Sequence, residues 1–188
     1  MLNFMPFTFK RLSIPDVILV EPNSFSDDRG FFFESYKESD FLSNGIDKKF
    51  VQDNFSHSVY SVIRGLHFQK TPKAQAKLVT VLKGKIFDVA VDIRKNSPTY
   101  GKWVSEILSD NIHNLLYIPE GFAHGYLVTS SESIVIYKCT DIYDPNDQYG
   151  IIWNDETIGV DWMYDSPILS EKDLMLPALN DQQFLPEY

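Results

Sequence analysis

Arg64-Gly65-Leu66-His67-Phe68-Gln69 is a short strand-like run in which a histidine lies between strand-forming apolar residues. Two later stretches have the same character, because polar side chains interrupt the apolar runs Gln75-Ala76-Lys77-Leu78-Val79 and Ile118-Pro119-Glu120-Gly121-Phe122-Ala123-His124-Gly125. Neighbouring strands that each bring polar groups into an apolar sheet can build the pocket of a small β-barrel. We therefore expect a barrel with His67 at the centre of its chemistry.

Short apolar runs recur at regular spacing on both sides of this stretch, separated by Gly, Pro, Asn or Ser. They span 17–21, 50–58, 62–69, 76–82, 85–93, 102–109, 113–118, 124–129 and 133–140. Runs of this length without a helical period predict an all-β antiparallel sandwich or barrel. Gly84 predicts a tight hairpin between its two flanking runs, and only 38–44 and the stretch after Ser170 resemble short helices.

The length of 188 residues fits a single domain spanning 1–188. We expect an N-terminal arm at about 1–16 and a C-terminal tail at about 170–188. Phe4, Phe7 and Phe9 alternate in the arm, which predicts an edge strand whose aromatic side chains need a covering surface. Trp153 and Trp162 need burial, so the segment after residue 141 is expected to be ordered.

The net charge of −9 argues against a general affinity for nucleic acid or for anionic membranes, because both need a positive surface field. No apolar run approaches the roughly 20 residues that span a bilayer. Cys139 is the only cysteine, so no internal disulfide can form, and Lys10 and Arg11 interrupt the short apolar start that a signal peptide would need. A cytoplasmic protein is the expectation.

Residue parity places His67 and Arg64 on opposite faces of a regular strand. They can share one pocket only if the backbone bulges near Gly65, which glycine permits. In the run 85–94, alternation places Phe87 on the core face, whereas Asp88 and Asp92 lie on a face that is either solvent or site.

The stretch Pro119-Glu120-Gly121-Phe122-Ala123-His124 fits the second half of the cupin signature, in which a tight turn aims a histidine into a barrel. Metal-binding cupins also carry His-x-His in the first half, whereas this chain has His67-Phe68-Gln69. Two histidines fall short of the three or more ligands that a catalytic metal usually takes. We therefore expect a metal-free site and disfavour a metal-dependent cupin oxygenase.

Many further motifs occur in one order, and together they closely resemble the dTDP-4-dehydrorhamnose 3,5-epimerase family over about residues 15–175. The motifs are Asp28-Arg29-Gly30-Phe31-Phe32-Phe33-Glu34, Gln52-Asp53-Asn54, Arg64 to Gln69, Ala76-Lys77-Leu78-Val79, Asp88-Val89-Ala90-Val91-Asp92, Ser97-Pro98-Thr99-Tyr100-Gly101, Ile118 to Gly125, Tyr137-Lys138, Trp153-Asn154-Asp155 and Ser170-Glu171-Lys172-Asp173.

The resemblance implies a cupin jelly-roll barrel with short peripheral helices, acting without a cofactor on dTDP-4-dehydro-6-deoxyglucose in rhamnose biosynthesis. It implies a homodimer that exchanges an N-terminal strand, so the arm would be covered by the partner. His67 would be the general base, Asp173 its orienting partner and Tyr137 the general acid, with Lys77 beside the C4 oxygen. From the residues alone, strand packing is the favoured interpretation of Tyr137, whereas Lys77 fits a barrel rim and an inward site equally well.

The resemblance also implies residues for the nucleotide. Arg29, Arg64 and Lys172 would lie near the diphosphate, Glu34, Gln52, Asn54 and His124 would bind base and sugar, and Phe32 and Tyr143 would be aromatic neighbours. The family usually has a glutamate at the thymine end where this chain has Gln148. Two alternatives stay open: an epimerase of one carbon in a related nucleotide-linked 4-keto sugar, and a non-catalytic cupin that binds a sugar nucleotide.

Overall fold

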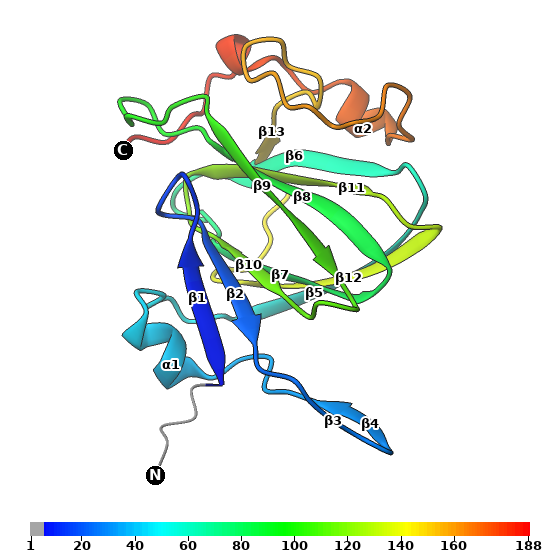
Figure 1. Ribbon diagram of the computed structural model, residues 1–188. Helices are drawn as coiled ribbons and strands as arrows, with labels where there is room; N and C mark the ends of the chain where they lie inside the picture. Colours follow the sequence, from blue (N-terminus) through cyan, green and yellow to red (C-terminus); the bar gives the residue numbers. More distant parts are fainter. Residues whose placement is uncertain (1–5) are drawn as a thin grey trace.

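Eleven strands form two antiparallel sheets that face each other, in a computed structural model that describes residues 6–188 (Figure 1). The six-stranded sheet contains, in spatial order, β1 (Phe7–Arg11), β2 (Ile18–Pro22), β10 (Leu115–Ile118), β7 (Lys77–Lys83), β12 (Glu132–Cys139) and β5 (Gln52–Val59). The five-stranded sheet contains β13 (Gln148–Gly150), β6 (Ile63–Gln69), β11 (Phe122–Val128), β8 (Lys85–Asp92) and β9 (Trp103–Ser109).

From β5 onward most connections carry the chain from one sheet to the other, which is the arrangement of a jelly roll. The helices are short and peripheral: α1 (Glu38–Ser43), α2 (Glu171–Leu174) and the 3-10 helix Leu179–Asp181. The predicted all-β jelly roll with short peripheral helices is therefore confirmed. Within residues 6–188, no helix is long and apolar enough to cross a membrane.

The core between the sheets consists of inward side chains from both layers. Val79 and Leu116 of the six-stranded sheet are fully buried together with Ile86 and Ala90 of β8. Strand alternation produces this pattern, because every second residue of each strand faces the opposite sheet.

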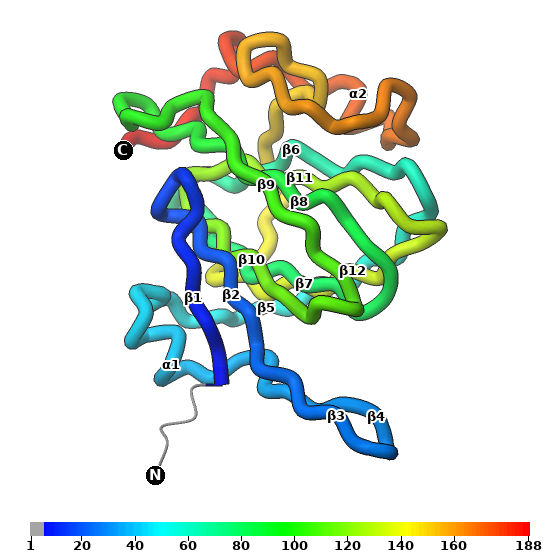
Figure 2. Tube along the Cα trace, in the orientation of Figure 1, coloured from blue at the N-terminus to red at the C-terminus, as the bar shows by residue number. Residues whose placement is uncertain are grey.

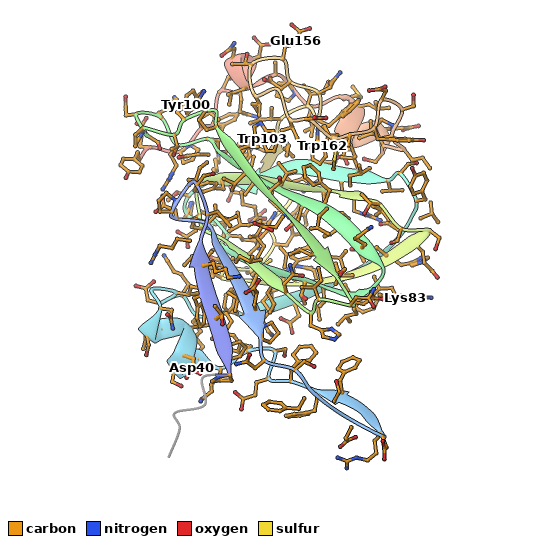
Figure 3. All side chains as sticks on the ribbon, in the orientation of Figure 1. Asp40, Lys83, Tyr100, Trp103, Glu156 and Trp162 are labelled. Atoms are coloured by element: carbon orange, nitrogen blue, oxygen red, sulfur yellow. The ribbon has the colours of Figure 1, made fainter. Side chains whose placement is uncertain are left out.

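The outer face of the five-stranded sheet is covered by the C-terminal segment, drawn in orange above the sheet in Figure 1. Val89 and Val91 point to this side of β8 and pack in one cluster with Ile151 and Trp162. Figure 3 shows Trp162 on this side of the sheet. Both faces of β8 are thus buried. Asp88 lies on the face that could have been solvent or site, and it is fully buried, so a solvent-facing position for it is wrong.

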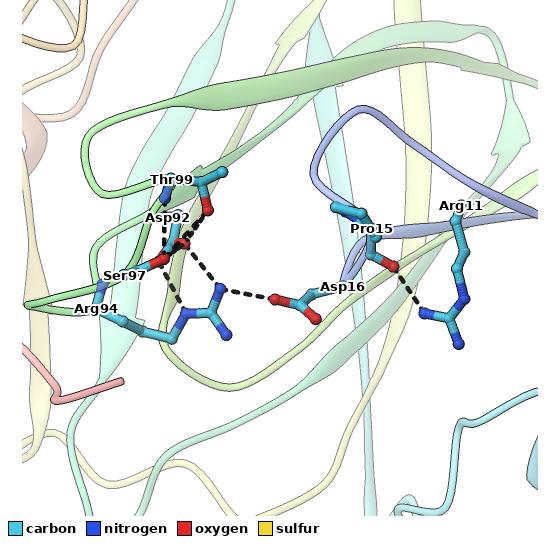
Figure 4. A network of polar contacts seen from close by, with 7 residues as sticks. All are labelled: Arg11, Pro15, Asp16, Asp92, Arg94, Ser97 and Thr99. Carbon is cyan, nitrogen blue, oxygen red and sulfur yellow. Dashed lines mark hydrogen bonds and ion pairs between the residues drawn. The ribbon is translucent and has the colours of Figure 1, made fainter.

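Asp92 is buried because a network of donors satisfies it (Figure 4). Arg94 Nε donates to Asp92 Oδ1 at 2.8 Å, and the hydroxyls of Ser97 and Thr99 each donate to Oδ2 at 2.6 Å. Burial opposes ionisation, but these hydrogen bonds outweigh it and hold the pKa of Asp92 below its usual range. Because Arg94 Nη2 also donates to Asp16 at 2.8 Å, the network joins the loop after β8 to the turn before β2.

The N-terminal strand β1 is covered by its own chain. The ring centroids of Phe7 and Phe9 lie 5.3 and 5.2 Å from that of Phe41 in α1, both with edge-on geometry. The expectation that a partner covers Phe7 is wrong, since its own chain already buries it. Phe9 is only partly buried, so its cover by a partner stays a prediction. Phe4 lies outside the described residues. The segment that projects from the body is instead the hairpin of β3 (Phe25–Asp27) and β4 (Gly30–Phe32), as Figure 2 shows.

The hairpin predicted at Gly84 is also wrong. Strands β7 and β8 lie in different sheets, so Gly84, with a φ of +82°, turns the chain from one sheet to the other. Alternation reports which residues are buried but not which runs pair, and for this reason the sequence could not reveal the crossing.

The bulge predicted near Gly65 is confirmed. His124 of β11 pairs with His67 of β6, and Tyr126 pairs with Arg64, so two steps on β11 oppose three on β6. The extra residue reverses the facing of Arg64 relative to His67, and both side chains line one pocket.

Gly65→Ala should lower the free energy of unfolding by about 3 kcal/mol, because a Cβ would sit 2.4 Å from Gly125 Cα and the backbone φ is +138°. Urea denaturation measures the change. Gly30→Ala is the matched control, since Gly30 has a φ of +125° but open space around its Cβ position. Equal losses in the two variants would show that the close approach to Gly125 does not matter.

Candidate functional site

A pocket of about 470 Å³ opens between the two sheets at the end covered by α2. This volume lies within the range of small-molecule sites. Its walls come from β5, β6, β7, β11, β12 and the C-terminal segment. The lining residues are Ser56, Val62, Ile63, Arg64, His67, Lys77, His124, Tyr126, Tyr137, Gln148, Ile168, Leu169, Ser170, Lys172 and Asp173. The structure therefore brings eight predicted site residues together in one cavity: Arg64, His67, Lys77, His124, Tyr137, Gln148, Lys172 and Asp173.

His67 and Asp173 are hydrogen-bonded although 106 positions separate them in the chain. His67 Nε2 lies 2.7 Å from Asp173 Oδ1, and the carboxylate is only 4% exposed. Burial opposes ionisation of Asp173, but hydrogen bonds from His67 and from Ser170 outweigh it and lower the pKa of this carboxyl. With Nε2–H donating to the carboxylate, Nδ1 is the basic atom of the imidazole, as a general base requires.

The short helix α2 holds Asp173 in place. Its N-cap is Ser170, whose Oγ accepts a hydrogen bond from the backbone N–H of Asp173 at 3.1 Å. The chain before the helix is fixed to the sheet, because the N–H of Ile63 donates to the carbonyl of Ile168 at 3.0 Å. The loop is thereby anchored beside β6, the strand that carries His67.

Tyr137 enters the pocket from β12, in the sheet opposite the one that carries His67. Burial is the main cause that raises the pKa of Tyr137 to about 12. The phenol therefore keeps its proton at neutral pH and can serve as a donor. Inversion of a carbon centre needs a base on one face of the carbon and an acid on the other. A base and an acid carried by opposite sheets can meet this need.

Lys77 and His124 form a second polar group in the pocket. His124 Nε2 lies 2.6 Å from Asp88 Oδ1, and His124 Nδ1 lies 3.5 Å from Lys77 Nζ. Burial lowers the pKa of both Lys77 and His124. With Nε2–H donating to Asp88, Nδ1 can accept from Lys77 Nζ, and this contact orients the end of the Lys77 side chain.

Asp88 is a site residue that sequence reasoning left undecided. It is fully buried, its Oδ1 is hydrogen-bonded to His124, and its Oδ2 has no hydrogen-bond partner among residues 6–188. The sequence did indicate that Asp88 has a partner, since a carboxylate in the interior of an apolar strand must be paired. Nothing in the spacing identified that partner as His124.

A chain of hydrogen bonds joins the other predicted residues at the pocket mouth. The amide of Gln52 donates to Asn54 Oδ1 at 3.1 Å, and the N–H of Tyr143 donates to Gln52 Oε1 at 2.8 Å. Gln148 Oε1 accepts from the Tyr143 hydroxyl at 2.7 Å and from Lys172 Nζ at 2.5 Å. A glutamate at position 148 could also accept the hydrogen bond that Gln148 accepts from Lys172.

Six predicted site residues do not line this pocket. Gln52, Asn54 and Tyr143 reach it only through the hydrogen bonds that lead to Gln148. The other three belong to the β3–β4 hairpin or follow it. Arg29 and Phe32 are exposed on the β3–β4 hairpin, and Glu34 follows it. Arg29 is occupied by an ion pair with Asp27 at the hairpin tip. The hairpin projects away from the two sheets (Figure 1), so these residues lie apart from the site of their own chain.

Over residues 6–188, no group of three or more His, Cys, Asp or Glu side chains is placed to hold a metal ion. The metal-free site stays a prediction.

Two antiparallel sheets around a pocket with a histidine–carboxylate pair define a jelly-roll protein of the cupin type with a proton-transfer site. The family model described as dTDP-4-dehydrorhamnose 3,5-epimerase matches residues 11–181. The chain belongs to this family.

Individual relatives agree with this assignment. The dTDP-4-dehydrorhamnose 3,5-epimerase of Methanothermobacter thermautotrophicus is 52% identical over 170 residues, covering 89% of this chain and 91% of the relative. That of Salmonella typhimurium is 50% identical, covering 94% of this chain and 97% of the relative. A crystal structure of the Legionella pneumophila epimerase in complex with dTDP-4-keto-L-rhamnose superposes with a TM-score of 0.93 at 43% identity, covering 97% of this chain and 98% of that one.

Proposed function

We propose that this protein inverts C3 and C5 of dTDP-4-dehydro-6-deoxyglucose to give dTDP-4-dehydrorhamnose, as a step of dTDP-rhamnose biosynthesis. Family membership supports the activity. The observation that carries it in this chain is the pairing of His67 with the buried Asp173 in a pocket that also contains Tyr137. The reaction would proceed without a cofactor, in a cytoplasmic enzyme built as one domain.

The chemistry follows from the C4 ketone, which acidifies the protons on both neighbouring carbons. His67 removes a proton from C3 or C5, and Asp173 stabilises the imidazolium that forms. The electron pair moves into the C4 carbonyl and gives an enolate. Tyr137 then returns a proton to the other face of the carbon, which inverts it.

Lys77 stabilises the enolate oxygen in this mechanism. A buried lysine is costly unless it meets negative charge, and the developing oxyanion supplies that charge. The contact between Lys77 and His124 supports this role, because it restrains the ammonium without neutralising it.

The nucleotide would occupy the mouth of the pocket. Arg64 and Lys172 supply positive charge for the diphosphate, in a protein whose net charge is −9. The base and sugar would contact the hydrogen-bonded group at the mouth and the second polar group: Gln52, Asn54, His124, Tyr143 and Gln148.

Incubation with dTDP-4-dehydro-6-deoxyglucose tests the proposal, with the product identified by proton NMR. The inverted configuration should appear at both C3 and C5. A product inverted at one carbon would establish the single-carbon epimerase instead, and bound but unchanged substrate would establish a non-catalytic cupin.

We further propose a homodimer in which the β3–β4 hairpin completes the partner's pocket with Arg29, Phe32 and Glu34. The hairpin projects from its own chain, and Phe32 is 70% exposed. Strand β5 lies at the edge of the six-stranded sheet, and Phe55 and Val59 on its outward face, with Val51 just before it, are more than half exposed. Exposed aromatic and aliphatic side chains that lie near one another are typical of subunit interfaces.

Mixing two variants tests whether the hairpin acts on the partner. Arg29→Ala should bind substrate weakly and His67→Asn should be inactive. In a mixed dimer, the intact hairpin of the His67→Asn chain would complete the intact His67 site of the other chain. Activity at limiting substrate should then recover to about a quarter of wild type after subunit exchange. No recovery in proven mixed dimers would show that the hairpin does not act across subunits.

A further inference from the structure

The inward face of strand β5 is polar along its whole length. Gln52, Asn54, Ser56 and Ser58 alternate on this face, whereas the outward residues are Asp53, Phe55, His57 and Val59. Strands of a small barrel usually place apolar residues inward, so a wholly polar inward face is unusual. Gln52 and Asn54 belong to the hydrogen-bonded group at the pocket mouth. Ser56 and Ser58 have no role in the function proposed so far.

The contacts of these serines lead to Arg64. Arg64 Nε donates to Ser58 Oγ at 3.0 Å, and Arg64 Nη2 donates to the backbone carbonyl of His57 at 3.3 Å. The neighbouring hydroxyl, that of Ser56, is 2.9 Å from the Tyr126 hydroxyl. Tyr126 pairs with Arg64 across β11 and β6, so the serines contact both members of that pair.

These bonds hold the guanidinium in one orientation while leaving it able to bind. A guanidinium has five N–H donors, and the two bonds to β5 leave three of them for a ligand. The Arg64 side chain is exposed at the pocket, where an unrestrained arginine would lose rotamer freedom on binding. Ser58 is only 5% exposed, so its hydroxyl is a fixed acceptor rather than a mobile one.

We propose that Ser58 is a positioning residue, which orients the Arg64 guanidinium toward the diphosphate of the substrate. The inference rests on the proposed function, which places Arg64 beside the diphosphate. Ser58 does not line the pocket, and it acts on the diphosphate through its bond to Arg64 Nε. The effect should therefore be specific for ligands that carry phosphates.

The test compares Ser58→Val with Ser58→Thr, two side chains of nearly equal shape that differ in the hydroxyl. Binding of dTDP and of thymidine is measured by titration calorimetry. Ser58→Val should bind dTDP about tenfold more weakly than wild type, Ser58→Thr should bind it as wild type does, and thymidine binding should be equal in all three. In turnover assays Ser58→Val should raise KM about tenfold and leave kcat nearly unchanged, because the bond involves neither His67 nor Tyr137.

Ser58→Ala and Ser133→Ala give a second comparison that adds no atoms to the barrel. Ser133 pairs with Ser58 across β12 and β5, it is fully buried, and its hydroxyl has no hydrogen-bond partner among residues 6–188. Ser58→Ala should weaken dTDP binding, and Ser133→Ala should not.

Unchanged dTDP binding in Ser58→Val and Ser58→Ala would overturn the inference while leaving the proposed function intact. Equal weakening of dTDP and thymidine would overturn it as well, because a general loss of structure would explain both. If wild type binds dTDP but leaves the 4-keto sugar unchanged, the proposed activity is wrong. The dTDP affinities of the Ser58 variants then still test whether Ser58 positions Arg64. Absence of dTDP binding by wild type would overturn both.

Discussion

His67→Asn should reduce turnover by about 10²- to 10⁴-fold, which is the usual contribution of a positioned general base. Asparagine is polar and can still donate toward Asp173, but it cannot accept a proton from carbon. The fold and the dTDP affinity should stay close to wild type, because the loop with Asp173 is also anchored through Ser170 and Ile168.

Initial rates and dTDP titration measure the two quantities separately. A variant that binds dTDP normally and keeps more than about a tenth of the wild-type rate would remove His67 from the base role.

Tyr137→Phe should slow product formation by about 100-fold or more, because the pocket loses the phenol whose raised pKa keeps it protonated. Proton abstraction by His67 does not need Tyr137. The variant should therefore still exchange substrate hydrogen with deuterated solvent, with retention of configuration, while inversion fails.

Tyr117→Phe is the matched control for this variant. Tyr117 is also a buried phenol with a raised pKa, but it packs in the cluster beneath β1 and α1 and does not line the pocket. Its rate should equal that of wild type. A Tyr137→Phe rate equal to that of Tyr117→Phe would assign Tyr137 to packing alone.

The sequence predicted most of the barrel because alternation determines burial. The strands with clear alternation, such as those around Val79 and Val89, lie where the pattern placed them. Which strands pair was harder to predict from the sequence. The runs on the two sides of Gly84 are consecutive, yet they belong to opposite sheets. The packing of Phe41 against Phe7 was not predicted, because local spacing does not show which strand a short helix packs against.

Some features of the site could be predicted from local sequence, whereas others depend on residues far apart in the chain. The bulge at Gly65 was predicted from a local conflict, in which Arg64 and His67 could not otherwise share a face. Asp173 could not be placed by local reasoning, because 106 positions separate it from His67, and only the resemblance assigned it. The partner of Asp88 and the contact between Ser58 and Arg64 depend on register between strands, which alternation does not determine.

The most direct test of the account is the reaction with dTDP-4-dehydro-6-deoxyglucose in deuterated water, with label located by NMR. The account predicts deuterium at both C3 and C5 of an inverted product, since one base and one acid serve both carbons that flank the ketone. Label at only one carbon, or inversion without any solvent label, would contradict it.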